Sequence, residues 1–493
     1  MLVESLDEAA ARSASRIPKP HNPMNTTKKP SLGLTGFFMM TGSMVMTIYS
    51  YPAFATSGFS LVFFLVVAGL LFFIPVALVA AELATGEGWQ TGGVYTWVAA
   101  AFGKRWGFTA IFLQWLQITV GFVTMLYFIV GALSYVLNWP ELNTNPWLKL
   151  GFILAIFWLV TAFNFNGTSW TARLATIGLV GGVSIPAFIL IGLAITYIVQ
   201  GDPMQIKMGM SNLLPDFKDV QTLVVLVAFI LSYAGIEASA PHVNDLENPK
   251  RNYPLAIILL TVFAIVINIL GALAIAIVIP ASKINLSAGV LQTFQVLLDQ
   301  YHFAWALKPV AILLALGTVA EVSAWVVGPA QGMFAAAKEG MLPPVFTKVN
   351  RKDVPIPFIL AQGVVVTIWA VILTLGGGGN NLSFLLAMAL TVVTYLAMYI
   401  LLFLAYFVLK TKRADVGRAY NIPGGKAGGF LVAGAGLLMV ILSMVISFLP
   451  PASVTGASES HYVEILLGSF VVSMVIPHVI FALRPRENLS RPA

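Results

Sequence analysis

Residues 232–245 read SYAGIEASAPHVND and follow VQTLVVLVAFIL, an apolar run long enough to enter a membrane. A glycine, a glutamate and a proline then stand where lipid favours leucine and valine. Backbone N–H and C=O groups without partners cost several kcal/mol each in lipid. An unwound segment in the membrane must therefore line a cavity or contact a ligand. The sequence predicts such a break at 232–238, around Gly235, with Glu237 facing the cavity.

The composition of the chain indicates a membrane protein. Of its 493 residues, 58% are hydrophobic and 10% are charged, and the mean hydropathy is +0.89. A soluble domain carries about 25% charged residues, so we expect an all-α polytopic membrane protein. The absence of cysteine excludes disulfides, thiolate nucleophiles and cysteine-ligated metals. Residues 1–31 are polar and predict a disordered cytoplasmic tail rather than a secretory signal or a transit peptide.

Apolar segments of about 20 residues predict twelve transmembrane helices. They are expected at 33–55, 58–84, 105–137, 147–164, 170–199, 219–243, 252–280, 303–337, 355–376, 382–410, 428–449 and 461–483. With both termini in the cytoplasm, 22 of the 27 Lys and Arg residues lie on inner segments. The net charge of +7 therefore indicates contact with anionic lipid, and nucleic acid need not be invoked. The loop at 281–301 predicts a short amphipathic helix at the outer surface.

A second interruption is expected in the first helix. Its middle holds Thr41, Gly42 and Ser43, followed by Met44, and these small polar residues favour unwinding more than leucine does. The alternative is that Gly and Ser only help helices to pack. Two interrupted helices five apart predict an inverted repeat.

The predicted repeats cover about 32–199 and 219–410. Two further helices follow at 428–483, and 484–493 form a short cytoplasmic tail. At such breaks, the N-terminus of a half-helix attracts a carboxylate and free carbonyls attract an ammonium. An amino acid carries both groups, so the pattern favours an amino-acid transporter that works by alternating access.

Three stretches resemble the amino acid/polyamine/organocation transporters, a superfamily with a LeuT-like fold of two inverted five-helix repeats. They are GGVYTWVAAAFGKRWGF at 92–108, ENPKRNYPLA at 247–256 and GPAQGMFAAAKEGMLPPVFTKVNRKDVPIP at 328–357. The resemblance extends from about residue 32 to 483. It implies a bacterial inner-membrane transporter without a cofactor.

Further stretches are similar to the glutamate/γ-aminobutyrate antiporters of that superfamily, among them SYAGIEASAPHVND at 232–245 and AEVSAWVVGP at 320–329. This resemblance implies exchange of external glutamate for internal γ-aminobutyrate in acid resistance. It also places six residues in the transport path: Tyr49, Glu237, Glu321, Trp325, Tyr395 and Tyr399. Tyr233 and Gly235, in the predicted break, are expected to belong to the same path.

Two departures accompany that resemblance. Ser50 stands where relatives carry an acidic residue. The tail at 484–493 is too short to plug the cytoplasmic opening as the longer tail of those antiporters does, so residual transport is expected at neutral pH.

Other readings of the same residues stay open. A negative pathway with Glu237 and Glu321 also suits a cation, as in an arginine/agmatine antiporter. A sensor or a channel shares the apolar pattern, whereas an enzyme is disfavoured because the sequence lacks HExxH and GxSxG. His242 and Asp245 are expected to make helix-end hydrogen bonds rather than a metal site. Glu82 and Glu87 are expected at the membrane interface.

Overall fold

The computed structural model describes residues 33–89, 92–166, 174, 177–218, 223–239, 246–376, 380–451 and 457–484. These residues form helices and loops, with one isolated antiparallel bridge between Gly86 and Arg418. Ten helices in this part of the chain are long and apolar enough to cross a membrane. An all-helical membrane protein, as the composition predicted, is therefore confirmed.

Nine of these ten helices match the expected spans to within a few residues, and the fifth span, expected at 170–199, is found at Gly178–Val199. The second span, Gly58–Ala84, contains α4 (Leu61–Ala68), η2 (Gly69–Phe73) and α5 (Ile74–Ala84). The fifth contains η3 (Gly178–Ser184) and α11 (Ile185–Val199). The others are α7 (Lys104–Val136), α9 (Pro146–Asn164), α15 (Pro249–Val278), α17 (Leu307–Lys338), α18 (Ile356–Gly376), α19 (Asn380–Lys412), α20 (Gly425–Ser447) and α21 (Ala457–Leu483).

The first helix of the chain is interrupted later than the sequence predicted. Thr41, Gly42, Ser43 and Met44 all lie inside α2 (Leu34–Val45), and the chain resumes as α3 (Tyr51–Ala55). Pro52, in the first turn of α3, has no N–H to donate to the carbonyl of Ile48, so a continuous helix would lack that hydrogen bond. Residues 46–50 lie outside both helices, and Met46 adopts an extended conformation.

The second interruption confirms the prediction made from residues 232–245. Helix α13 (Leu226–Leu231) ends, and α14 (Ile236–Ser239) begins after a four-residue gap. Gly235 lies in this gap with φ of +113°, a conformation open only to glycine at low cost. A Cβ atom at this position would also stand 2.9 Å from ring carbons of Trp325. Both the backbone angle and the packing therefore require glycine at this position.

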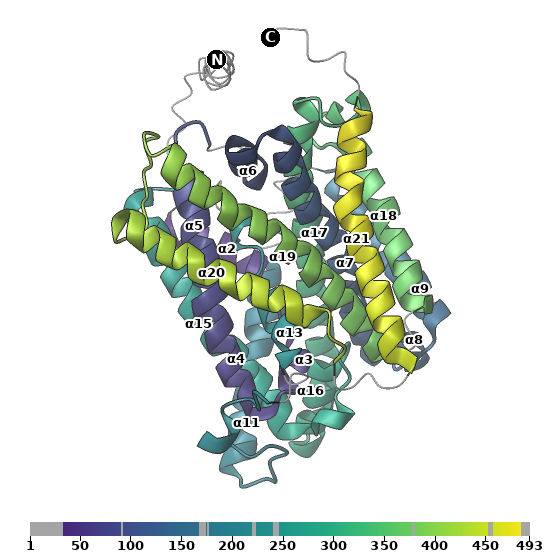
Figure 1. Ribbon diagram of the computed structural model, residues 1–493. Coiled ribbons are helices and arrows are strands. Elements are labelled where there is room, and N and C mark those ends of the chain that lie inside the picture. The colour runs from purple at the N-terminus through teal and green to yellow at the C-terminus, as the bar shows by residue number, and fades with distance from the viewer. Residues whose placement is uncertain are drawn as a thin grey trace, which may run out of the picture.

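The arrangement has α7 at its centre and α20 and α21 at its periphery (Figure 1). In α7, the most apolar stretch of 18 residues is 94% buried inside the protein. In α21 the corresponding stretch is only 17% buried, so its apolar side chains face outward, toward lipid. Helix α7 packs against α17 and α19. These three helices form the frame around the two interruptions.

Shorter helices mark the two ends of the bundle. Helix α6 (Val94–Phe102), which the sequence reading missed, lies at the upper end in Figure 1. Helix α16 (Gly289–Gln300) lies at the lower end, within the loop where a short amphipathic helix was predicted. Its predicted apolar face is buried, with Val290, Leu291, Phe294, Leu297 and Leu298 each at most 4% exposed.

Candidate functional site

A small cavity lies between the two interruptions, enclosed by α7, α17 and α19. Its volume is about 30 Å³, which is room for about two water molecules. It is lined by Val45, Thr47, Tyr49, Gln117, Ile118, Gly121, Thr124, Met125, Leu231, Ala234, Glu321, Trp325, Thr391 and Tyr395. An amino acid would need the surrounding helices to separate.

The first interruption gives the cavity bare backbone. Tyr51 N donates to Ile48 O at 3.2 Å, and the hydroxyls of Thr47 and Ser50 lie 3.2 Å apart. Among the described residues, no hydrogen bond uses the N–H of Thr47, Ile48 or Tyr49 as donor. Thr47 and Tyr49 line the cavity, so this stretch of backbone without helical hydrogen bonds borders it.

The two interrupted helices run side by side in opposite directions. Helix α2 contacts α14, and α3 contacts α13. The first half of one interrupted helix thus pairs with the second half of the other. Both interruptions therefore meet at the same depth in the bundle.

Glu237 is buried beside the cavity and is saturated with donors. Tyr395 Oη donates to its Oε1 at 2.5 Å, Tyr399 Oη to its Oε2 at 2.6 Å, and Gln114 Nε2 to its Oε1 at 2.7 Å. Tyr399 Oη also accepts from Gly235 N at 2.9 Å. The two tyrosine rings stack with centroids 4.7 Å apart. Glu237 is not among the residues that line the cavity. Its hydrogen bonds instead link α14 to α7 and α19.

Glu321 and Gln117 differ from Glu237 because they have free polar atoms. Glu321 on α17 is 6% exposed and Gln117 on α7 is 1% exposed. Neither Glu321 Oε1 nor Gln117 Nε2 has a hydrogen-bond partner in the described part of the chain. Both side chains line the cavity. An acceptor and a donor are therefore offered to a ligand from facing helices.

The remaining predicted residues fall into two groups. Tyr49, Trp325 and Tyr395 line the cavity. Tyr233 does not; its ring packs on Phe73 with centroids 5.4 Å apart. Thr41 and Gly42 are buried within α2 and are not among the lining residues, and Ser43 and Met44 belong to the same helical stretch.

Sequence reasoning missed the two glutamines of α7. They stand three residues apart in LQWLQITV at 113–120, an otherwise apolar span. Residues three apart share a face of a helix, and uncharged polar side chains inside a span need partners. The spacing and the polarity of Gln114 and Gln117 therefore could have indicated a polar site on this face of the helix.

Glu82, which was expected at the membrane interface, is fully buried in a charge network at the upper end of the bundle. Its carboxylate accepts from Lys410 Nζ at 2.5 Å, Arg418 Nη1 at 2.6 Å and Tyr406 Oη at 3.0 Å. It also accepts from Ile422 N at 2.9 Å. The network ties α5 to the end of α19 and to the segment that follows α19.

A second polar contact at the upper end joins α6 to its neighbours. Tyr95 Oη donates to Glu339 Oε2 at 2.8 Å, and Lys104 Nζ lies 3.1 Å from the same oxygen. Burial, together with the charge of Glu339, raises the pKa of Tyr95 well above its usual range. The hydroxyl therefore stays protonated and remains a donor.

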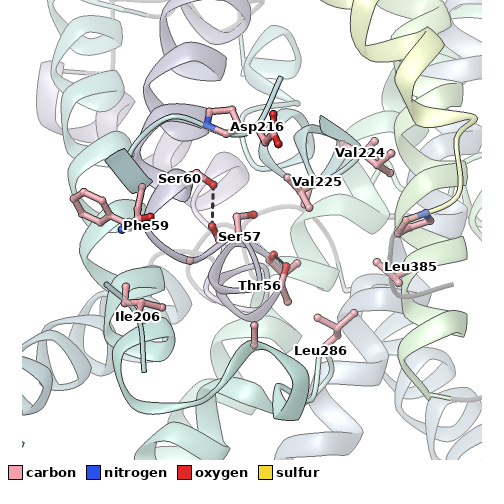
Figure 2. Close-up of a pocket in the computed structure, with 18 of the residues that line it drawn as sticks. Thr56, Ser57, Phe59, Ser60, Ile206, Asp216, Val224, Val225, Leu286 and Leu385 are labelled. Carbon is pink, nitrogen blue, oxygen red and sulfur yellow. Dashed lines mark hydrogen bonds between the residues drawn. The ribbon is translucent and has the colours of Figure 1, made fainter. Parts of the chain in front are cut away.

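The lower end holds a larger cavity of about 810 Å³. Figure 2 shows Thr56, Ser57 and Ser60 on one side and Val224, Val225 and Leu385 on another. Its walls come partly from α3, α13 and α19, and both α13 and α19 also border the small cavity. The two cavities thus follow one another along the same helices.

No group of three or more His, Asp or Glu side chains suited to a metal ion occurs among the described residues. His242 and Asp245 lie outside those residues. So do the predicted tail at 1–31 and, except for Arg484, the predicted tail at 484–493.

A helical membrane protein with a buried polar site between two interrupted helices has the architecture of a small-molecule transporter. The chain belongs to the amino acid permease family, whose profile matches residues 32–471.

Individual relatives cover almost the whole chain. A glutamate/gamma-aminobutyrate antiporter of Lactococcus lactis subsp. lactis is 52% identical over 459 residues, which cover 93% of this chain and 91% of the relative. An uncharacterized transporter of Legionella pneumophila is 34% identical over 94% of this chain and 99% of its own length. A probable agmatine/putrescine antiporter of Lactococcus lactis is 25% identical over 89% of this chain and 92% of its own.

Proposed function

We propose that this amino acid permease exchanges external glutamate for internal γ-aminobutyrate by alternating access, and that the exchange serves acid resistance. The 52% identity to an antiporter named for those two substrates, over 93% of the chain, carries the proposal. The relative named for agmatine and putrescine is 25% identical, so a cationic substrate pair is the weaker alternative.

The architecture that we propose has twelve spans in two inverted five-helix repeats. The ten continuous spans and the two interrupted ones make up this number. The pairing of α2 with α14 and of α3 with α13 supports the inversion, because five helices per repeat place the second repeat upside down in the membrane. The repeats cover about 32–199 and 219–410, with two further helices at 428–483 and tails at 1–31 and 484–493.

The orientation follows from charge. The upper end carries Lys104, Lys338 and Lys410 at helix ends, and 22 of the 27 basic residues belong to segments on that side in the twelve-span topology. Cytoplasmic loops are rich in Lys and Arg. We therefore place the upper end and both termini in the cytoplasm of a bacterium, and the larger cavity on the external face.

The transport path that we propose leads from the larger cavity to the small one. Thr47, Tyr49, Glu321, Trp325 and Tyr395 would meet the substrate directly, since they line the small cavity. Glu237, Tyr399 and Gly235 would hold the second interruption in shape through their hydrogen bonds. Bare N–H groups at 47–49 suit a carboxylate, and Glu321 Oε1 suits an ammonium group.

The test is counterflow in liposomes that contain the purified protein. Vesicles are loaded with γ-aminobutyrate, and labelled glutamate, arginine and other amino acids are offered outside at acidic pH. The proposal expects glutamate uptake that requires internal γ-aminobutyrate. Uptake that is equal in empty vesicles indicates a channel, no uptake indicates a sensor, and uptake of arginine against agmatine supports the alternative pair.

A further inference from the structure

Gln117 has a position and an environment that its neighbour Gln114 does not have. Gln114 donates its amide to Glu237 at 2.7 Å. Gln117, one helical turn along the same face of α7, is 1% exposed, and its Nε2 lacks a partner within the described residues. A buried amide donor without a partner is rare in folded proteins and calls for an explanation. Because Gln117 lines the cavity, the explanation that fits is a ligand group.

The chemistry of the two proposed substrates indicates which group it is. Glutamate and γ-aminobutyrate share an amine and a distal carboxylate, and they differ only in the α-carboxylate that decarboxylation removes. A site that carries both molecules needs one acceptor for the amine and one donor for the distal carboxylate. Among the described residues that line the cavity, Glu321 Oε1 and Gln117 Nε2 are the buried side-chain atoms without a hydrogen-bond partner; the first can accept, and the second, with two N–H bonds, can donate.

Glu237 is unsuited to the amine in this conformation because three donors already occupy its oxygens. The α-carboxylate, present in glutamate alone, has the bare N–H groups at 47–49 as its donors. We propose that Gln117 is a specificity-determining residue that binds the carboxylate shared by both exchange substrates. This inference rests on the proposed function. It adds that Gln117 contributes equally to the binding of glutamate and of γ-aminobutyrate.

The test compares three proteins in liposomes: wild type, Gln117→Leu and Gln117→Glu. The Michaelis constant is measured for external glutamate and for external γ-aminobutyrate. Inhibition is measured with 2-aminobutyrate, which has the amine and the α-carboxylate but no distal carboxylate. For Gln117→Leu we expect both Michaelis constants to rise by the same factor, roughly tenfold or more. Inhibition by 2-aminobutyrate should be unchanged.

Gln117→Glu keeps the shape of the side chain and reverses the hydrogen-bond polarity. Glutamine has an amide in place of the distal carboxylate, so this variant should take up glutamine in preference to glutamate. It also keeps the inference testable if Gln117→Leu does not fold, which gel filtration of the purified variant reveals.

The outcomes distinguish a failure of the proposed exchange function from a failure of the role proposed for Gln117. A wild-type protein that exchanges neither substrate refutes the proposed function. Wild-type exchange with a rise for glutamate alone in Gln117→Leu assigns Gln117 to the α-carboxylate and overturns the inference. Unchanged Michaelis constants, or a Gln117→Glu variant that still prefers glutamate, overturn it as well.

Discussion

Replacing Glu82 by glutamine should lower the free energy of unfolding more than neutralising the exposed Glu87 or Lys104. The side chain is 0% exposed and accepts four hydrogen bonds, two of them from Lys410 and Arg418. Those two side chains are themselves only 9% and 5% exposed. Glu82→Gln keeps the volume and removes the charge, so both cations stay buried without their counter-ion.

The magnitude follows from the burial of all three charges. Removing one member of a buried ion pair costs about 3–5 kcal/mol because the remaining charge is left uncompensated. We therefore expect the free energy of unfolding to fall by about that amount. The matched control is Glu87→Gln, since Glu87 lies five residues along the same segment but is exposed. Surface substitutions of this kind usually stay within about 0.5 kcal/mol.

The assay is unfolding of the purified variants in mixed micelles, followed by the loss of helical circular dichroism. A second pair, Glu82→Leu alone and with Lys410→Met, tests whether removing one cation recovers part of the loss. If Glu82→Gln shifts the transition no further than Glu87→Gln, the buried charge network does not hold α5 to α19 and the reasoning is refuted.

Three further predictions concern the site and its surroundings. Glu237→Ala should cut glutamate counterflow sharply while the protein still purifies as a folded species, because it releases three hydrogen bonds at the second interruption; wild-type rates would remove Glu237 from the transport cycle. Gly235→Ala should lower both stability and exchange, since φ of +113° and a contact of 2.9 Å with Trp325 leave no place for a methyl group; an unaffected variant would show that the break is not held in this shape. Lys104→Ala should lower the unfolding free energy by less than about 1 kcal/mol, because its ion pair with Glu339 is solvent-exposed; a loss as large as that of Glu82→Gln would contradict the distinction between the two pairs.

The sequence predicted the apolar spans well because lipid imposes a length and a composition on each helix. The interruption near Gly235 was also predictable, since glycine and glutamate interrupt the apolar run locally. The first interruption was misplaced by about five residues. Thr41, Gly42 and Ser43 suggested unwinding, yet the helix continues through them to Val45, and residues 46–50 separate it from the short helix that contains Pro52. The influence of a proline on the preceding turn outweighs the weak propensities of small polar residues.

Contacts between distant segments set the rest of the site. Glu82 and its partners Lys410 and Arg418 are more than 300 residues apart in the chain, so the local pattern AELATGEGW gave no sign of burial. The contrast between Gln114 and Gln117 is likewise invisible in sequence. It depends on which turn of α7 faces Glu237 and which faces the cavity.

The most direct test of the central claim is a structure of the protein determined by electron cryo-microscopy with glutamate bound. The claim is that the substrate binds between the two interrupted helices. The account predicts density for one glutamate in an expanded form of the small cavity, in contact with Glu321, Gln117 and the backbone of residues 47–49. Density confined to the larger cavity at the lower end, or an uninterrupted helix through residues 46–50 or 232–235, would contradict it.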